Sequence, residues 1–298
     1  MSFALLLAAT FLGLPLFAVV VTSCFNALDR GVPVRPTRAG AVWFLREWAA
    51  WVRTLLAHPS GFFARAPERR PPAFPAEPRI PVVLVPGFAL NQSSMGAIAR
   101  HLRLCGWDWV HVINNEPWES TVEGYARGLA EAVEALRQAS GAQQVDLIAH
   151  SMGGLISGLF INEMGGDAVV RRLVTLGTPW HGTRMHVFGR RRQVRDLAPE
   201  SPVLERARPP AVPLTSVWST HDHLVWPARS AIVPGAHEVR FTHVGHLDLL
   251  YANRVHVAVA EALAAPATPR LPDRDAPDPG TDASPTPDQI AHPDPAAS

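Results

Sequence analysis

The sequence predicts an α/β domain in which a mostly parallel β-sheet carries helices on both faces, preceded by an N-terminal membrane helix. Between residues 80 and 265, short β-branched apolar runs alternate with longer amphipathic runs, a pattern typical of β-α-β units. A chain of 298 residues can bury one large core. The formal net charge of +1 gives no basic footprint, so we expect no nucleic-acid partner.

Residues 1–25 are predicted to be a transmembrane or signal-like segment. Phe3 to Val21 is almost wholly apolar and long enough to cross a bilayer as a helix. A cleaved signal peptide and a lipoprotein are the alternatives, the latter because Val21-Thr22-Ser23-Cys24 resembles a degenerate lipobox. No Lys or Arg precedes the apolar run, which counts against both. We therefore expect a single-pass protein of a bacterial cell membrane. The arginines that follow favour a cytoplasmic domain but leave the side of the membrane open: Arg30, Arg35 and Arg38.

Residues 26–79 are predicted to hold an amphipathic helix and a proline-rich linker. Within Ala41 to Leu56, apolar residues recur at helical spacing and arginines lie on another face. This helix either packs on the main domain or lies in a membrane interface, where Trp and Arg are favoured. Prolines crowd residues 67–78, as in a linker. The apolar stripe consists of Phe44, Trp48, Trp51, Val52 and Leu55.

The main domain, residues 80–265, is expected to alternate strands with helices. The tail, residues 266–298, is rich in Pro, Asp, Ala and Thr with few large apolar residues, so it is predicted to be disordered. The expected strands are 81–85, 110–113, 145–149, 173–176, 215–218 and 239–244, and the expected helices are 95–104, 122–138, 152–163 and 250–264.

Ser151 is the candidate nucleophile. It follows the predicted strand 145–149 and precedes a predicted helix, with Gly153 and Gly154 close behind. A serine on so tight a turn is pushed out of the sheet, and small neighbours relieve the crowding there. The helix that follows aims its N-terminal N–H groups at the same place, which favours developing negative charge. A helix-capping serine would occupy the same junction and is the structural alternative.

His246 is the candidate base, because a serine hydroxyl needs a neighbour to take its proton. It lies on a loop between the last predicted strand and the last predicted helix, at the sheet edge where functional groups gather. His243 is the alternative, but it falls inside the strand pattern.

Asp222 is the candidate acid that would hold the imidazole in the correct tautomer. It is the only carboxylate in the loop after the predicted strand 215–218. Asp196 precedes that strand, and Asp248 is too close to His246 in sequence, so both are weaker alternatives.

The oxyanion of an acyl intermediate needs two backbone N–H donors. Met152 follows the nucleophile, and Phe88 lies in the loop after the first strand of the main domain. No phosphate loop or metal-ligand cluster appears; His221 and His223 alternate, but no third ligand accompanies them. We expect neither a metal nor an organic cofactor.

Five motifs occur in order and together resemble the bacterial lipases and esterases of the α/β-hydrolase superfamily. The resemblance covers about Ile80 to Ala264 and implies the α/β-hydrolase fold, ester or lipid substrates and the chain order Ser, acid, His. The stretch between Thr183 and Pro213 is short, which implies a small lid or none. The motifs are Val85-Pro86-Gly87-Phe88, Ala149 to Gly154, Leu176 to Thr183, Asp222 to Pro227 and Val244-Gly245-His246.

The sequence therefore predicts a membrane-associated carboxylic ester hydrolase that works through an acyl-enzyme. Acyl transfer or thioester cleavage on the same fold is an alternative, as is a non-catalytic, membrane-tethered binding protein. We expect the residues before about Pro67 to attach the protein to the membrane and to contribute nothing to the chemical step.

Overall fold

A computed structural model describes residues 13–29, 37–63, 67–69, 79–115, 120–189 and 191–266. Three features discussed above lie wholly or mostly outside these ranges. They are the first half of the apolar N-terminal run, most of the proline-rich linker, and the tail from residue 267 onward.

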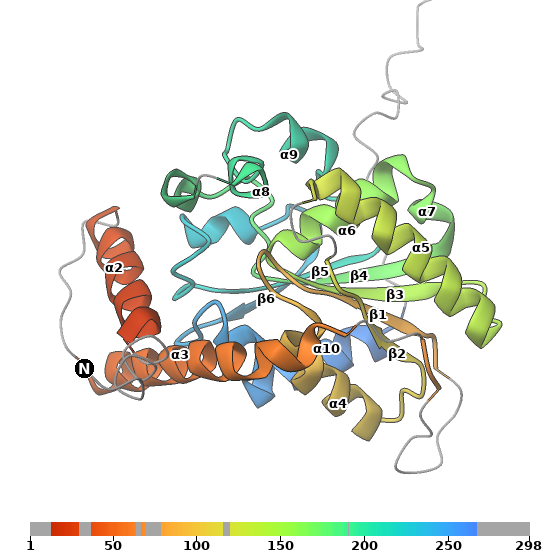
Figure 1. The fold of residues 1–298 in the computed structure, drawn as a ribbon, viewed down its shortest axis with the longest axis horizontal. Coiled ribbons are helices and arrows are strands. Elements are labelled where there is room, and N and C mark those ends of the chain that lie inside the picture. The colour runs from red at the N-terminus through yellow and green to blue at the C-terminus, as the bar shows by residue number, and fades with distance from the viewer. Residues whose placement is uncertain are drawn as a thin grey trace, which may run out of the picture.

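A six-stranded sheet forms the centre of the fold, with strand order β2-β1-β3-β4-β5-β6 (Figure 1). Every neighbouring pair is parallel, which confirms the predicted α/β class. The strands are β1 (Val82–Val85), β2 (Val110–Val112), β3 (Val145–His150), β4 (Val170–Leu176), β5 (Leu214–Ser219) and β6 (His237–Phe241).

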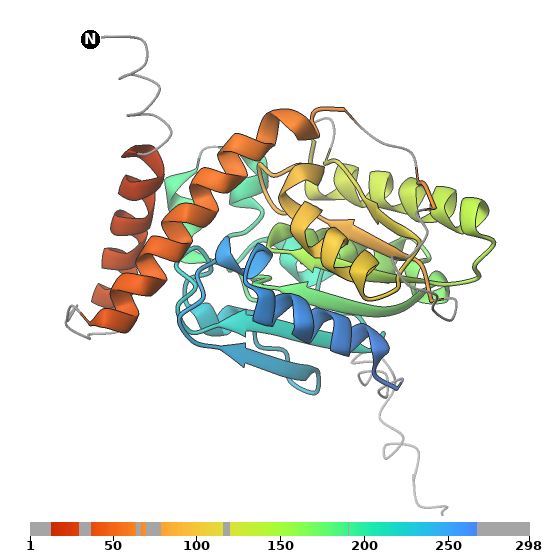
Figure 2. The same ribbon diagram turned by 90° about the horizontal axis from the view of Figure 1, so that it is seen from below.

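Helices cover both faces of the sheet because successive side chains in each strand point to opposite sides. In β1, Val83 and Val85 join the core under α5 and α6, whereas Val82 and Leu84 join the core under α4 and α10. Figure 1 shows the first pair of helices above the sheet, and Figure 2 shows the second pair across its other face. The long helices of this domain are α4 (Gly96–Leu104), α5 (Val122–Ser140), α6 (Met152–Glu163) and α10 (Asn253–Ala264).

Short helices occupy the connections. A segment between β4 and β5 holds η4 (Arg184–Phe188), α8 (Arg192–Arg195) and α9 (Pro202–Arg206), and we call it the cap segment. The other short elements are η2 (His58–Gly61), η3 (Gln92–Met95), α7 (Gly166–Val169), η5 (Ala228–Ala231) and η6 (Asp248–Leu250).

Two N-terminal helices, α2 (Leu14–Asp29) and α3 (Arg38–Ala57), precede the sheet. Thr37 caps α3 by accepting a hydrogen bond from the Gly40 N–H at 3.0 Å. One face of α3 is buried against the domain, as the packing interpretation of this helix requires (Figure 2). Within the ranges that the structure describes, no helix combines the length and the apolar character needed to cross a bilayer.

Candidate active site

The turn at Ser151 joins the buried strand β3 directly to α6. Ser151 has φ 55° and ψ −125°, a conformation that is costly for a residue with a side chain. Its N–H donates to the Leu176 carbonyl of β4 at 2.9 Å, which holds the turn against the sheet. The Ser151 side chain makes no capping hydrogen bond to α6, so the helix-cap alternative does not account for its position.

Asp222 and His246 meet on the loops after β5 and β6. His246 Nδ1 lies 2.7 Å from Asp222 Oδ2, and both side chains are buried. The second carboxylate oxygen, Oδ1, accepts hydrogen bonds from the Leu224 and Val225 N–H groups at 2.9 Å each. With Nδ1–H donating to Asp222, Nε2 of a neutral His246 is left as the basic nitrogen.

His150, next to Ser151, connects the serine turn to the His246 loop. Its Nε2 lies 3.1 Å from the His246 carbonyl oxygen, and the two imidazole rings are 4.7 Å apart between centroids. Burial lowers the pKa of His150 to about 3, so the ring is neutral and its N–H donates to that carbonyl. Ser151 and His246 line the same cavity, so the structure brings the three candidate residues together.

In the buried pair of His246 and Asp222, each residue shifts the pKa of the other. Burial lowers the pKa of His246, but the charge and hydrogen bond of Asp222, with a smaller effect from Glu47, outweigh it and leave that pKa above its ordinary value. Burial raises the pKa of Asp222, but His246 and the backbone donors outweigh it, so Asp222 stays ionised. Such a carboxylate stabilises an imidazolium that forms when His246 takes a proton.

The loop after β1 packs directly on the serine turn. A Cβ atom built on Gly87 would lie 2.9 Å from Ser151 Cβ, so only glycine permits this approach. Asn115 Nδ2 supports the loop by donating to the Pro86 carbonyl at 3.0 Å. In the part of the chain that the structure describes, neither the Phe88 nor the Met152 N–H is bonded to a backbone carbonyl. Phe88 lines the cavity with Ser151, and Met152 begins α6.

An apolar cavity of about 460 Å³ opens beside Ser151. Its volume falls within the range of small-molecule sites. Its apolar walls include Trp51 and Leu55 of α3, Met185, Phe188 and Leu197 of the cap segment, Leu224 of the Asp222 loop, and Phe88 and Leu90 of the loop after β1. The arrangement fits an apolar chain lying next to a polar reacting group.

The alternative residues lie elsewhere. His243, with φ 54°, stacks on His221 at 4.3 Å between ring centroids. Asp248 Oδ2 lies 3.3 Å from Arg46 Nε, and Asp196 follows α8 in the cap segment. Among the described residues, no group of three His, Cys, Asp or Glu side chains is placed to hold a metal ion.

Comparison with known proteins agrees with this architecture. Residues 80–189 match a family model described as the alpha/beta hydrolase fold. The chain therefore has the α/β-hydrolase fold.

Solved structures with the same fold include lipases. The mature Bacillus licheniformis lipase BlEst2 is 16% identical with a TM-score of 0.55, over 65% of this chain and 96% of that one. Aspergillus fumigatus lipase B is 19% identical with a TM-score of 0.54, over 67% and 57% of the two chains. A putative non-heme bromoperoxidase, BpoC of Mycobacterium tuberculosis, is 13% identical with a TM-score of 0.51, over 68% and 97%. At these identities the likeness shows the fold of the chain and leaves its substrate to the site.

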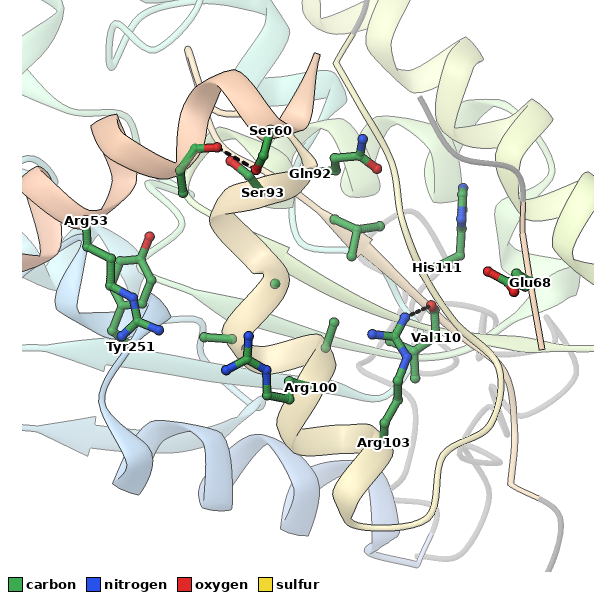
Figure 3. A pocket seen from close by; sticks show the side chains of 15 residues that line it. Arg53, Ser60, Glu68, Gln92, Ser93, Arg100, Arg103, Val110, His111 and Tyr251 are labelled. Atoms are coloured by element: carbon green, nitrogen blue, oxygen red, sulfur yellow. Dashed lines mark hydrogen bonds between the residues drawn. The ribbon is translucent and has the colours of Figure 1, made fainter. Parts of the chain in front are cut away.

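A second cavity, of about 390 Å³, lies beside α4 (Figure 3). Two of its arginines make contacts within the protein: Arg103 donates to the Val110 carbonyl at 2.8 Å, and the Arg53 guanidinium lies 4.5 Å from the centroid of the Tyr251 ring. Burial lowers the pKa of His111, which also lines it, to about 4. None of the sequence-predicted site residues lines this cavity.

Sequence reasoning missed several residues that support the site. His150 and Asn115 hold its loops, and α3 supplies Trp51, Leu55 and the buried carboxylate of Glu47. Of these, only His150 carried a signal, because it lies inside the motif around Ser151.

Proposed function

We propose that this chain is a serine-dependent carboxylic ester hydrolase acting on esters with an apolar acyl chain. The observation that carries the proposal is the buried 2.7 Å contact between His246 and Asp222 beside a serine whose backbone is strained outward into an apolar cavity. Strain of this kind needs support from the surrounding structure and is concentrated at functional sites.

In the proposed reaction, Ser151 attacks the acyl carbonyl while His246 Nε2 takes its proton. Asp222 orients the imidazole and stabilises the imidazolium. The Phe88 and Met152 N–H groups bind the oxyanion. His246 then gives the proton to the leaving alcohol, and water, activated by the same histidine, releases the acid from Ser151.

The substrate assignment follows from the walls of the cavity. Apolar side chains from α3, the cap segment and the Asp222 loop surround the space next to Ser151, which favours an acyl chain over a charged acid. Two structures with this fold carry the name lipase. A series of p-nitrophenyl esters from acetate to palmitate, assayed for kcat/KM, identifies the preferred chain length. Equal rates across the series would contradict an acyl-binding role for this cavity.

The nucleophile is tested with Ser151→Ala and a fluorophosphonate probe. The wild-type chain should be labelled and should hydrolyse p-nitrophenyl butyrate. We expect Ser151→Ala to lose labelling and to lower kcat by about 10⁴-fold or more with an unchanged melting temperature. Ser140→Ala, at the end of α5, is the matched control and should behave as wild type. Full activity in folded Ser151→Ala would reject the proposed mechanism.

We also propose that the N-terminal residues attach the enzyme to a bacterial membrane. The apolar run from Phe3 to Val21 and the exposed apolar side chains of Leu16, Phe17 and Val20 on α2 support this. The full chain should sediment with membranes, and a chain beginning at Asp29 should not. If the two chains distribute equally, the N-terminal residues are not the anchor.

A further inference from the structure

A carboxylate from the N-terminal region lies against the loop that carries His246. Glu47, on α3, has no exposed surface. Its Oε1 accepts a hydrogen bond from the Leu247 N–H at 2.9 Å, and its Oε2 accepts one from the Asp248 N–H at 2.8 Å. These are the two consecutive N–H groups that follow His246. One carboxylate therefore fixes the backbone on the C-terminal side of the candidate base.

Gly245, on the other side of His246, also packs on Glu47. A Cβ atom at Gly245 would overlap the Glu47 side chain, and the atoms nearest to that position all belong to Glu47. Gly245 is not among the residues with positive φ, so its backbone would accept alanine if Glu47 were absent. The loop from Gly245 to Asp248 is thus shaped around this carboxylate.

The surroundings of Glu47 explain why a carboxylate, rather than an amide, suits this position. The two N–H groups point to different oxygens of Glu47, and glutamine would place an NH₂ donor against one of them. His223 Nε2 lies 3.6 Å from Oε1, but burial lowers the pKa of His223 to about 4, so this imidazole is neutral at pH 7. Burial raises the pKa of Glu47 itself to about 7, and the two backbone hydrogen bonds oppose that rise.

The charges near Glu47 come from three places. Arg46 of α3 pairs with Asp248 on the His246 loop. The Asp222 loop contributes Asp222 and His223, and the His246 loop contributes His246. An ionised Glu47 raises the pKa of His246. In return, His246 lowers the pKa of Glu47, whereas Asp222 raises it.

We propose that Glu47 is a positioning residue for His246, acting from the N-terminal helix through the backbone of residues 245–248. The proposal rests on the function given above for His246 and extends it. It also replaces the expectation that residues before Pro67 take no part in the chemical step. Through Glu47, α3 belongs to the catalytic centre as well as to the cavity wall.

The first test is Glu47→Gln in the full chain, with Glu131→Gln on the exposed face of α5 as the matched control. We expect a 10- to 100-fold lower kcat for p-nitrophenyl butyrate with less than a threefold change in KM, because the base is displaced while the acyl cavity is kept. The pKa on the acid side of the kcat/KM profile should fall, because the fraction of Glu47 that is ionised near pH 7 raises the pKa of His246. A folded Glu47→Gln with wild-type kcat and an unchanged pH profile would overturn the proposal.

The second test uses the overlap between Glu47 and Gly245. Gly245→Ala alone should lower kcat as Glu47→Ala does, because it pushes the carboxylate away. In the Glu47→Ala background, Gly245→Ala should cost less than a further twofold, since the space is then free. Additive losses in this double-mutant cycle would show that the two residues act independently and would overturn the proposed contact.

The third test does not depend on ester hydrolysis. Histidine labelled with ¹³C at Cε1 reports the titration of His246 by NMR, with the resonance assigned through His246→Gln. Glu47→Gln should lower the pKa of His246, whereas Glu131→Gln should not. If the wild type hydrolyses no ester but this shift is seen, the proposed function fails and the role of Glu47 in positioning stands. If the wild type is active and no shift is seen, the role of Glu47 fails alone. If Glu47→Gln does not fold, Gly245→Ala takes its place.

Discussion

The serine turn and the His246 loop reach the same cavity by different routes. The serine turn is continuous in sequence, running from β3 through Ser151 into α6, and its geometry follows from a strand that must turn at once into a helix. The His246 loop depends on Asp222, 24 residues before it, and on Glu47, whose contact with Leu247 spans 200 residues. The first half of the site is therefore local, and the second is assembled from segments that are far apart in sequence.

This difference has a physical consequence. The serine turn keeps its shape as long as β3, α6 and the neighbouring strand β4 form, because the Leu176 carbonyl holds the Ser151 N–H and the backbone conformation dictates where the side chain points. A loop held by distant side chains loses its position when any one of them is removed, even though nothing in the loop has changed. We therefore expect the position of His246 to be more sensitive than that of Ser151 to substitutions at residues distant in sequence.

The largest effect on the assembled half is expected from Asp222→Asn. The amide no longer stabilises the imidazolium and favours the wrong tautomer, so kcat should fall by about 10³- to 10⁴-fold. Steady-state kinetics with p-nitrophenyl butyrate measures this loss, and fluorophosphonate labelling shows whether Ser151 is still reactive. Asp196→Asn is the matched control and should change kcat less than twofold. A larger loss in the control than in Asp222→Asn would mean that the acid is misassigned.

Removal of α3 should have the next largest effect. It tests most directly whether the His246 loop depends on distant residues. A chain that begins at Glu68 lacks Glu47, Trp51 and Leu55, so its kcat/KM should fall by about 100-fold or more through misplacement of His246 and loss of a cavity wall. It should also melt at a lower temperature and aggregate, because the apolar face that α3 covers is exposed.

A chain that begins at Asp29 keeps α3 and serves as the control. It should retain wild-type kcat/KM on soluble esters. Equal activity of the two truncated chains, measured on soluble protein, would show that the His246 loop needs no support from the N-terminal region.

The effect of pH is smaller: below the pKa of His246, kcat/KM should fall tenfold for each pH unit. Only neutral His246 accepts the serine proton, so kcat/KM should rise with pH and level off above the pKa of His246. Because Asp222 holds that pKa above its ordinary value, the midpoint should lie above about 6.5. In Asp222→Asn the midpoint should move down, because the carboxylate that favours the imidazolium is gone. A midpoint well below 6.5 in the wild type would contradict this electrostatic description.

Most of the sheet could be predicted because strands in a parallel sheet are buried on both faces and have short, uninterrupted apolar sequences. Two strands, β4 and β6, differ from the expected boundaries. β4 begins at Val170, earlier than expected, because the charge of Arg171 is satisfied by Asp146 at the start of β3. β6 ends at Phe241 rather than at residue 244, and His243 has a positive φ.

The role of α3 could not be predicted, although the helix itself was. Apolar residues mark the expected stripe, but Trp48, Trp51 and Leu55 are only partly buried. The buried positions of this helix are Glu47, Ala50 and Thr54, which carry a carboxylate, a methyl group and a hydroxyl. A hydrophobic pattern does not identify such a face, and the partner of Glu47 lies 200 residues away. Ser151, Asp222 and His246 were selected by their loops and remain predictions as catalytic residues.

The contact between Glu47 and Leu247 also sets an order of events during synthesis. The α3 helix leaves the ribosome first, and the loop that it must hold follows 200 residues later. At about 5–20 residues per second, that interval lasts about 10–40 s. Throughout it, Glu47 is an ordinary solvated carboxylate and its future partner N–H groups do not yet exist. Residues 145–163, which form the serine turn with its strand and helix, also leave the ribosome before the His246 loop, so the part of the site that contacts Glu47 is the last to be made.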